Sequence, residues 1–287
     1  MHAPVRQTMT DLQIRDMTPA DIDAAVALYR SGGWEERRSF LETVMANPSC
    51  RLLAGVLEGA VIGTGLATVN GPVGWVGSIF VDADLRRQGY GRAMTQAVCD
   101  VLDSAGCVTQ ALIASEYGKP IYEKMGFRID GWYQILEALP LSAAPVPPTG
   151  TSLRPMREED IDRGGELDRR ATGEDRRGLL APLAGGSWLL EANDELLGFL
   201  IQILPDSAAI VAPDPDDGAC LLDLLRHLGT GRARTLHAAA LKGNEDGQLV
   251  LERRGWNPTF ATPRMLRGKS IEWDPTLIWS LLGFAFG

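Results

Sequence analysis

Residues 79–91 read I-F-V-D-A-D-L-R-R-Q-G-Y-G, and this stretch constrains the fold more than any other part of the chain. An apolar, strand-like run ends at Val81, a polar turn follows, and Gly89 and Gly91 open a segment of helical periodicity. A turn of this kind gathers unpaired backbone N–H groups at the positive end of a helix dipole. Glycines there allow an anion to approach the backbone, because no Cβ stands in the way. The stretch therefore predicts a strand, an anion-binding turn and a helix in succession.

Two widespread phosphate-binding patterns do not fit this turn. The dinucleotide pattern G-x-G-x-x-G requires a third glycine or alanine where Met94 stands, and the P-loop pattern G-x-x-x-x-G-K-[ST] does not occur in the chain. Arg86, Arg87 and Arg92 add positive charge around the turn, which favours a phosphate ligand of another class. The alternative is an ordinary strand-to-helix turn that happens to contain two glycines.

A second segment, residues 117–127, reads Y-G-K-P-I-Y-E-K-M-G-F and predicts a short helix. The alternating residues 109–114 before it are typical of a strand. Pro120 suits the first turn of a helix, where no N–H is needed, and Gly126 is placed to end it. Phe127 then starts another extended, aromatic-rich run.

Together the two segments resemble the GCN5-related N-acetyltransferase (GNAT) superfamily. Residues 86–91 fit its motif [RQ]-x-x-G-x-[GA], and residues 117–127 are similar to its lYeklGF segment. The resemblance implies that acetyl-CoA is the cosubstrate and that Tyr122 protonates the departing CoA sulfur. Ser115 and Gly118 stand where the family often has Asn and Ala. The cofactor-binding residues that we expect are Ile79, Phe80, Val81, Arg86, Arg87, Gln88, Gly89, Tyr90, Gly91, Arg92 and Ser115. Without the resemblance, Tyr122 would be read as a half-buried aromatic residue with a solvated hydroxyl.

The chain repeats one plan on either side of an uncharged, Pro- and Ala-rich stretch that has the composition of a linker. Both halves open with a short strand and the pattern R-x-M-x-x-x-D-I, at residues 15–22 and 154–161. We therefore expect a GNAT domain in residues 1–140, a linker in 141–150 and a related domain in 151–287.

The order of the expected elements repeats as well. Strands are predicted near residues 50–57, 61–69, 73–81, 109–114 and 127–137, and again near 187–191, 196–203, 208–212, 234–240 and 258–267. Helices are predicted near residues 90–105 and 118–125, and again near 216–228 and 245–253. This order is similar to that of the acyl-CoA N-acyltransferase fold, present twice. The fold class expected is α+β, each copy being a mixed, mostly antiparallel sheet flanked by helices.

The second copy lacks the cofactor motif. Residues 213–218 read P-D-P-D-D-G, in which prolines remove amide donors and aspartates repel a pyrophosphate, and Leu251 stands near the place of Tyr122. We expect this copy to bind no CoA and to serve the substrate site or an interface. The charged run at residues 168–177 predicts a solvated helix end and loop. The alternative is that these residues form a surface of ion pairs that helps to recognise the substrate.

Charge and composition exclude several classes of function. The net charge is −9 and both halves are acidic, so general binding to nucleic acid is not expected. The four cysteines form no C-x-x-C pair and three histidines cannot build a His-rich metal site, so we expect reduced thiols and no metal. With no apolar signal core and no apolar stretch of membrane-spanning length, a cytoplasmic monomer or homodimer is expected. The hydrophobic residues 279–287 are expected to pack on the domains or in a dimer interface.

The reaction implied is direct transfer of acetyl from acetyl-CoA to a primary amine of a small molecule. A backbone N–H near Phe80–Val81 would face the developing oxyanion. The proton of the amine could pass to Glu35, Glu36, Glu116 or a water chain, and the sequence does not choose among them. Two alternatives stay open: a non-catalytic sensor that binds acyl-CoA, and an acyltransferase that uses a longer acyl chain. The depth of the pocket around Trp75, Ile79 and Tyr122 would decide the latter.

Overall fold

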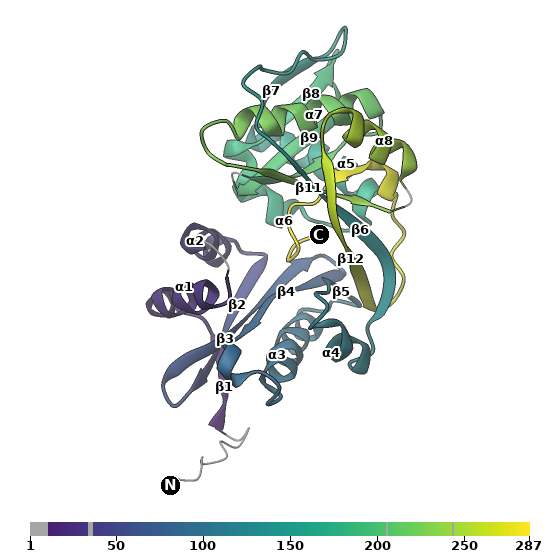
Figure 1. The fold of residues 1–287 in the computed structure, drawn as a ribbon. Coiled ribbons are helices and arrows are strands. Elements are labelled where there is room, and N and C mark those ends of the chain that lie inside the picture. Colours follow the sequence, from purple (N-terminus) through teal and green to yellow (C-terminus); the bar gives the residue numbers. More distant parts are fainter. Residues whose placement is uncertain (1–10, 34–36, 205, 243) are drawn as a thin grey trace.

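The computed structural model describes residues 11–33, 37–204, 206–242 and 244–287, which form two bodies with the C-terminus between them (Figure 1). The first half contains β1 (Gln13–Asp16), α1 (Ile22–Ser31), α2 (Arg38–Ala46), β2 (Cys50–Leu57), β3 (Ala60–Asn70), β4 (Val73–Val81), α3 (Tyr90–Ser104), β5 (Thr109–Ile113), α4 (Lys119–Lys124) and β6 (Arg128–Ala138). The second contains β7 (Ser152–Pro155), α5 (Ile161–Thr172), α6 (Arg177–Leu180), β8 (Trp188–Ala192), β9 (Glu195–Leu204), β10 (Ser207–Val211), α7 (Pro215–Leu228), β11 (Leu236–Leu241), α8 (Glu245–Arg253), β12 (Asn257–Gly268) and β13 (Ile278–Ser280). The predicted α+β class and the predicted repeat of elements are confirmed.

The repeated pattern R-x-M-x-x-x-D-I forms the same corner between a strand and a helix in both halves. Arg15 donates two hydrogen bonds to Asp21, at 2.7 and 2.9 Å, and Arg154 donates two to Asp160, both at 2.7 Å. Each aspartate also accepts the backbone N–H three residues before it, at 2.8 Å. The methionine of each pattern is buried. The pattern therefore recurs because it fixes the entry of the first helix.

The larger sheet contains strands from both halves. Its order is β1-β2-β3-β4-β5-β12-β6-β11, so β12 of the second half lies between β5 and β6 of the first. In turn, β6 lies between β12 and β11. The smaller sheet has the order β13-β10-β9-β8-β7. Among the strands of the described residues, only β4 and β5 pair in parallel, which confirms a mostly antiparallel arrangement. Residues 139–151, which contain no helix or strand, connect the halves.

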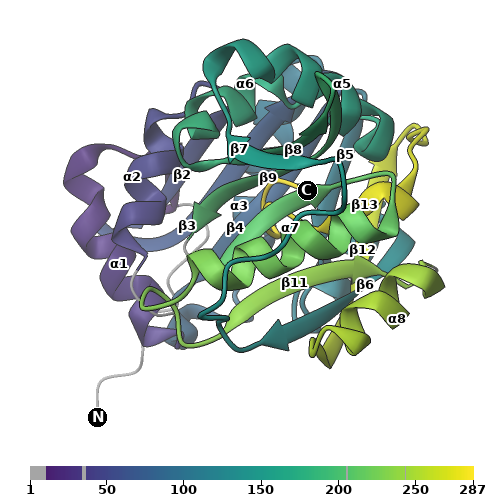
Figure 2. The same ribbon diagram turned by 90° about the horizontal axis from the view of Figure 1, so that it is seen from above.

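Helices cover both faces of the strands. In the first half, α1 and α2 lie on one side of β2–β5 and α3 and α4 on the other (Figure 1). In the second half, α5 and α6 lie on one side and α7 and α8 on the other (Figure 2). A single apolar core joins the α1–α2 side of the first half to the α5–α6 side of the second, and it includes Phe40, Leu179, Leu282 and Phe286. The expectation that the C-terminal residues pack on the domains is confirmed.

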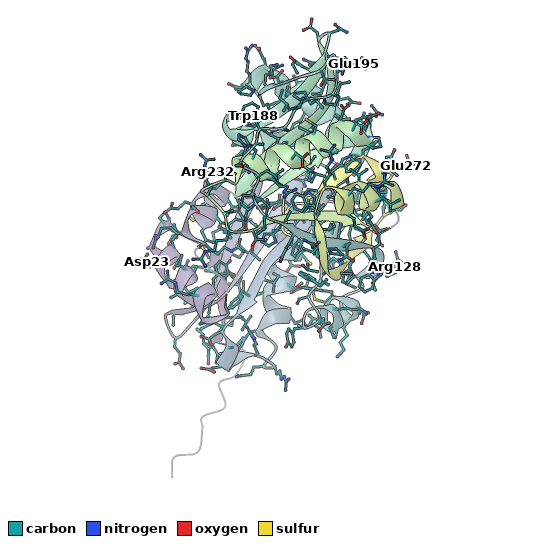
Figure 3. The ribbon with its side chains drawn as sticks, turned by 45° about the horizontal axis from the view of Figure 1, so that its top comes forward. Asp23, Arg128, Trp188, Glu195, Arg232 and Glu272 are labelled. Atoms are coloured by element: carbon teal, nitrogen blue, oxygen red, sulfur yellow. The ribbon has the colours of Figure 1, made fainter. Side chains whose placement is uncertain are left out.

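The hairpin between β8 and β9 turns at Asn193 and Asp194, whose φ values are 48° and 65°. Both residue types tolerate positive φ in tight two-residue turns. Glu195 then begins β9 and lies at the tip of the second half (Figure 3).

Candidate active site

Strands β4 and β5 separate beside the predicted cofactor site. They pair only from Val73↔Thr109 to Trp75↔Ala111, whereas β4 continues to Val81. Beyond Trp75, β4 keeps β3 on one side, and no strand in the described part of the chain pairs with its other side. Since the backbone groups of a strand alternate between its two edges, some N–H and C=O groups of residues 76–81 are open to a ligand that adds as a further strand.

A β-bulge lies in the same part of β4. Pairing with β3 shifts between Leu66↔Gly77 and Thr64↔Phe80, and Ser78 between them has a φ of 48°. Thr64 Oγ1 donates a hydrogen bond to the Ser78 carbonyl at 2.9 Å, which holds this conformation. Bulges re-aim the residues that follow them, and Ser78 and Ile79 both line a cavity described below.

The glycine-rich turn leads into α3 as predicted. Gly89 has a φ of 92° and is the N-cap of α3, so no side chain satisfies the first amide groups of this helix. Arg86 Nε donates to the Val81 carbonyl at 3.3 Å, and its guanidinium lies over the Phe80 ring at 5.6 Å. The side chains of Arg86, Arg87, Gln88 and Arg92 are exposed. Positive side chains and open amides thus surround the turn.

Three of the predicted cofactor residues have buried side chains. Phe80 and Val81 are 7% exposed and Tyr90 is 1% exposed. The Tyr90 hydroxyl has no hydrogen-bond partner among the described residues. A ligand at the surface could therefore meet only the backbone of these three residues.

Tyr122 lies on α4 and is 9% exposed. Its ring packs edge-on against Phe127, with 6.0 Å between the ring centroids. A Cβ at Gly118 would lie 2.7 Å from the Tyr122 ring, so glycine at this position leaves room for the tyrosine. Burial raises the pKa of Tyr122 to about 12, which keeps its hydroxyl protonated at neutral pH. Ser115 Oγ accepts the Gly118 N–H at 3.1 Å and so fixes the approach to α4.

A cavity of about 580 Å³ lies between the halves. Its walls include Ile79 of β4, Ser115, Tyr122 of α4, residues 203–207 without Pro205, and residues 237–239 of β11. The structure thus brings Ile79, Ser115 and Tyr122 together at one space. Residues 80–92 are not among its described walls, so the glycine-rich turn lies outside this cavity.

One cluster on the cavity wall was not predicted as a site. His237 lies between two carboxylates, with Nδ1 3.7 Å from Glu137 Oε1 and Nε2 3.9 Å from Asp206 Oδ2. All three residues line the cavity and each side chain is about 40% exposed. They come from β6, from the turn before β10 and from β11, so no local motif could have revealed them. Of the predicted proton acceptors, Glu116 is exposed and not a wall residue, and Glu35 and Glu36 lie outside the described residues.

The corresponding turn of the second half is shorter and closed. Residues 212–214 connect β10 to α7, where residues 82–89 connect β4 to α3. Asp214 is the N-cap of α7, and its Oδ1 accepts the Asp216 N–H at 2.8 Å. An aspartate therefore occupies one of the amide groups of α7 whose equivalents stay open on α3.

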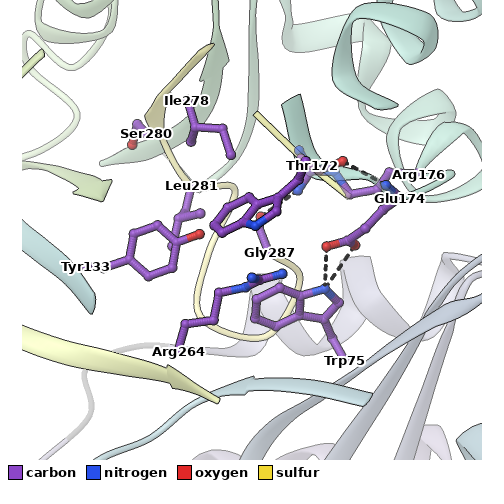
Figure 4. A pocket seen from close by; sticks show the side chains of 11 residues that line it. Trp75, Tyr133, Thr172, Glu174, Arg176, Arg264, Ile278, Ser280, Leu281 and Gly287 are labelled. Atoms are coloured by element: carbon purple, nitrogen blue, oxygen red, sulfur yellow. Dashed lines mark hydrogen bonds between the residues drawn. The ribbon is translucent and has the colours of Figure 1, made fainter. Parts of the chain in front are cut away.

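The expectation of a solvated charged run at residues 168–177 is wrong for three of its members. Asp168, Glu174 and Arg176 are 0–2% exposed, and Arg176 donates to both Asp168 oxygens at 2.8 and 2.5 Å. Glu174 accepts from Trp75 Nε1 at 2.9 Å, and the close-up in Figure 4 shows this pair. It also accepts from Asn70 Nδ2 at 2.7 Å. The sequence pattern could not show these partners, because they lie about a hundred residues away in the first half.

Neither a membrane-spanning helix nor a metal-binding cluster is found among the residues that the structure describes. No helix there combines the length and apolar character needed to cross a membrane. No set of three His, Cys, Asp or Glu side chains there is arranged to hold a metal ion.

Comparison with known proteins gives one family match. Residues 8–127 match the model of the acetyltransferase (GNAT) family. A curated glucosamine 6-phosphate N-acetyltransferase from Trypanosoma brucei brucei is 39% identical over 56 residues, which are 20% of this chain. The match spans 38% of the length of that relative.

Solved structures resemble the chain over both halves. A putative acetyltransferase from Pyrococcus horikoshii has a TM-score of 0.81 at 23% identity, covering 100% of this chain and 99% of that one. A tandem GNAT protein from the clavulanic acid biosynthesis pathway has a TM-score of 0.63 at 15% identity, covering 90% and 99%. A GCN5-related N-acetyltransferase from Sphaerobacter thermophilus has a TM-score of 0.61 at 16% identity, covering 93% and 100%. At these identities the likeness shows the fold, and it extends through both copies.

Proposed function

We propose that this protein transfers acetyl from acetyl-CoA directly to a primary amine of a small molecule, because residues 8–127 match the model of the GNAT acetyltransferase family. In this proposal residues 1–140 bind acetyl-CoA, residues 141–150 are the linker, and residues 151–287 are a degenerate copy that completes the substrate site. The observation that carries it is the open edge of β4, which runs into the same cavity as Tyr122.

The open edge and the glycine-rich turn fit the two ends of CoA. Backbone groups at residues 79–81 would pair with the pantetheine arm as a further strand does. The open amides after Gly89, with Arg86, Arg87 and Arg92 around them, would hold the pyrophosphate, and Gln88 lies in the same turn. A Cβ at Gly91 would meet Ile121 at an ordinary 3.7 Å. Packing within the protein therefore does not account for glycine at this position, and the missing Cβ leaves room for a phosphate.

The chemistry follows from the groups beside the thioester. The amine nitrogen attacks the carbonyl carbon, a backbone N–H near Phe80–Val81 stabilises the oxyanion, and the C–S bond breaks as the amide forms. Tyr122 donates its proton to the departing sulfur. The thiol of CoA, with a pKa near ~8.5, is a much stronger acid than this buried tyrosine. Proton transfer from Tyr122 to the sulfur is therefore unfavourable by itself and must be coupled to the breaking of the C–S bond, after which the tyrosinate regains a proton from solvent.

The amine must also lose a proton. We assign this role to His237, because histidine is the commonest proton acceptor in enzymes and this one lines the cavity. Glu137 and Asp206 flank its ring and would stabilise the imidazolium that forms. The same two carboxylates favour an amine over an anion in the cavity.

The proposal is tested by incubating the purified protein with acetyl-CoA and a panel of primary amines. The expected result is release of CoA thiol that depends on the amine, with an acetylated product seen by mass spectrometry. Binding of acetyl-CoA without thiol release for any amine would favour the sensor. Faster release from a longer acyl-CoA than from acetyl-CoA would favour the acyltransferase of longer chains.

A further inference from the structure

The C-terminal segment Ile278–Gly287 occupies the place in the second half that stays open in the first. In the first half, the free edge of β4 faces the cavity. In the second, β13 pairs with the equivalent edge of β10, at Ile210↔Ser280 and Val211↔Ile278. The Ala212 N–H continues this pairing by donating to the Leu277 carbonyl at 3.0 Å. The chain therefore supplies its own added strand here.

Trp279 closes the turn that follows β10. Its Nε1 donates to the Ala212 carbonyl at 3.0 Å, and the side chain is 2% exposed. A Cβ at Gly218 would lie 2.3 Å from the Trp279 ring, so glycine at this position leaves room for the tryptophan. In the first half's turn, a Cβ at Gly91 would meet nothing closer than Ile121 Cδ1 at 3.7 Å.

After β13 the chain crosses to the first half as a tight loop, and the C-terminus lies between the two bodies (Figure 1). The Phe286 N–H donates to the Gly283 carbonyl at 3.1 Å, which closes the loop on itself. Thr68 Oγ1 of β3 donates to the Ala285 carbonyl at 3.2 Å. A Cβ at Gly77 would lie 2.3 Å from Ala285 Cβ, so the loop packs directly on β4 where β4 leaves β5.

This loop forms one wall of the cavity that holds Tyr122. Residues 280–286 all line it. Phe284 belongs to this wall and is 45% exposed, so a large part of its apolar side chain is not buried in the core. Phe260 of β12 is 53% exposed and lines the same cavity. Apolar side chains from both halves make up most of the remaining walls, among them Ile79, Ile113 and Leu204.

We propose that the segment Ile278–Gly287 is an acceptor-specificity element, which selects amines carrying an apolar group through contact with Phe284. Strand β13 fixes the segment to the edge of β10 that corresponds to the cofactor edge of β4. The loop after β13 places Phe284 on the wall of the cavity that would bind the acceptor amine. This proposal rests on the proposed acetyl transfer only in calling the selected ligand an acceptor. It explains why the second half keeps the fold while losing the cofactor turn.

The test compares 2-phenylethylamine with ethanolamine as probes. Binding is measured by calorimetry in the presence of CoA, and transfer is measured as kcat/KM with acetyl-CoA. The wild type is expected to prefer 2-phenylethylamine in both measurements. Phe284→Ala is expected to reduce that preference at least about tenfold, the usual effect of losing one apolar contact in a specificity pocket. Because Phe284 is partly exposed, this variant is expected to fold.

Leu249→Ala is the matched control, because Leu249 is 49% exposed and is not a described wall residue of the cavity. It should leave the preference unchanged. The inference is overturned if the wild type binds both amines equally, or if Phe284→Ala keeps the wild-type preference. A Phe284-dependent preference in binding without acetyl transfer to either amine would support the specificity element and contradict the proposed function.

Discussion

Glu174→Ala should destabilise the protein strongly, because Glu174 joins the two halves through buried hydrogen bonds. The substitution leaves Trp75 Nε1 without its acceptor, and Asn70 Nδ2 keeps only a 3.3 Å contact to the Phe286 carbonyl. Leaving one buried donor unsatisfied costs about 1–3 kcal/mol, and Trp75 Nε1 becomes such a donor, so the free energy of unfolding should fall by roughly 1–3 kcal/mol. The nearby Arg176 also loses a neighbouring negative charge.

Urea denaturation followed by tryptophan fluorescence measures this loss, because unfolding changes the surroundings of the tryptophans, Trp75 at the interface among them. Glu195→Ala is the control, since Glu195 is exposed at the tip of the β8–β9 hairpin (Figure 3). It should change stability by less than about 0.5 kcal/mol. Glu174→Gln keeps an acceptor oxygen and should cost less than Glu174→Ala. If Glu174→Ala loses no more than the control, the buried network does not hold the halves together and the reasoning fails.

Other predictions follow from single features of the structure. Tyr122→Phe should lower kcat roughly 10²–10⁴-fold and leave acetyl-CoA affinity unchanged, and steady-state kinetics with an unchanged kcat would remove Tyr122 from the mechanism. His237→Gln should lower kcat at neutral pH and recover as the pH rises, because amines then arrive unprotonated; a loss that is equal at all pH values would exclude proton transfer. The pKa of Asp160 is lowered to about 2 by the Arg154 hydrogen bonds, so its stabilising effect is complete above the ordinary value of 3.8 and is lost as the pH falls toward 2. Asp160→Asn should therefore make unfolding less dependent on pH in this range, which acid titration by circular dichroism would check. A chain ending at Pro147 lacks β12, the strand between β5 and β6, and should fail to unfold cooperatively.

The sequence predicted the elements well because each has a local cause. Gly126 follows the end of α4 with the positive φ typical of that position, and Gly89 begins α3 with a positive φ that glycine adopts without strain. The repeated Arg and Asp of the R-x-M-x-x-x-D-I pattern marked the duplication, and the structure shows the hydrogen bonds that require them.

The features that the sequence did not predict depend on residues far apart in the chain. β12 joins the first half through pairing with β5 and β6, and neither strand carries a signal for this partner. Glu174 is buried because Trp75 and Asn70 supply donors, although the charged residues around it indicated solvent. His237, Glu137 and Asp206 gather only when three separate segments meet at the cavity.

The stoichiometry of acetyl-CoA binding tests the central claim most directly. Calorimetry on the full chain should give one site, because the first amides of α3 after Gly89 are open to a ligand. In the second half, Asp214 accepts an amide at the start of α7 and Trp279 binds the Ala212 carbonyl in the turn before it. Gly89→Glu combined with Gly91→Glu should abolish this binding, since two carboxylates would then face the pyrophosphate. Two sites per chain, no site, or one site that survives the double substitution would contradict the account.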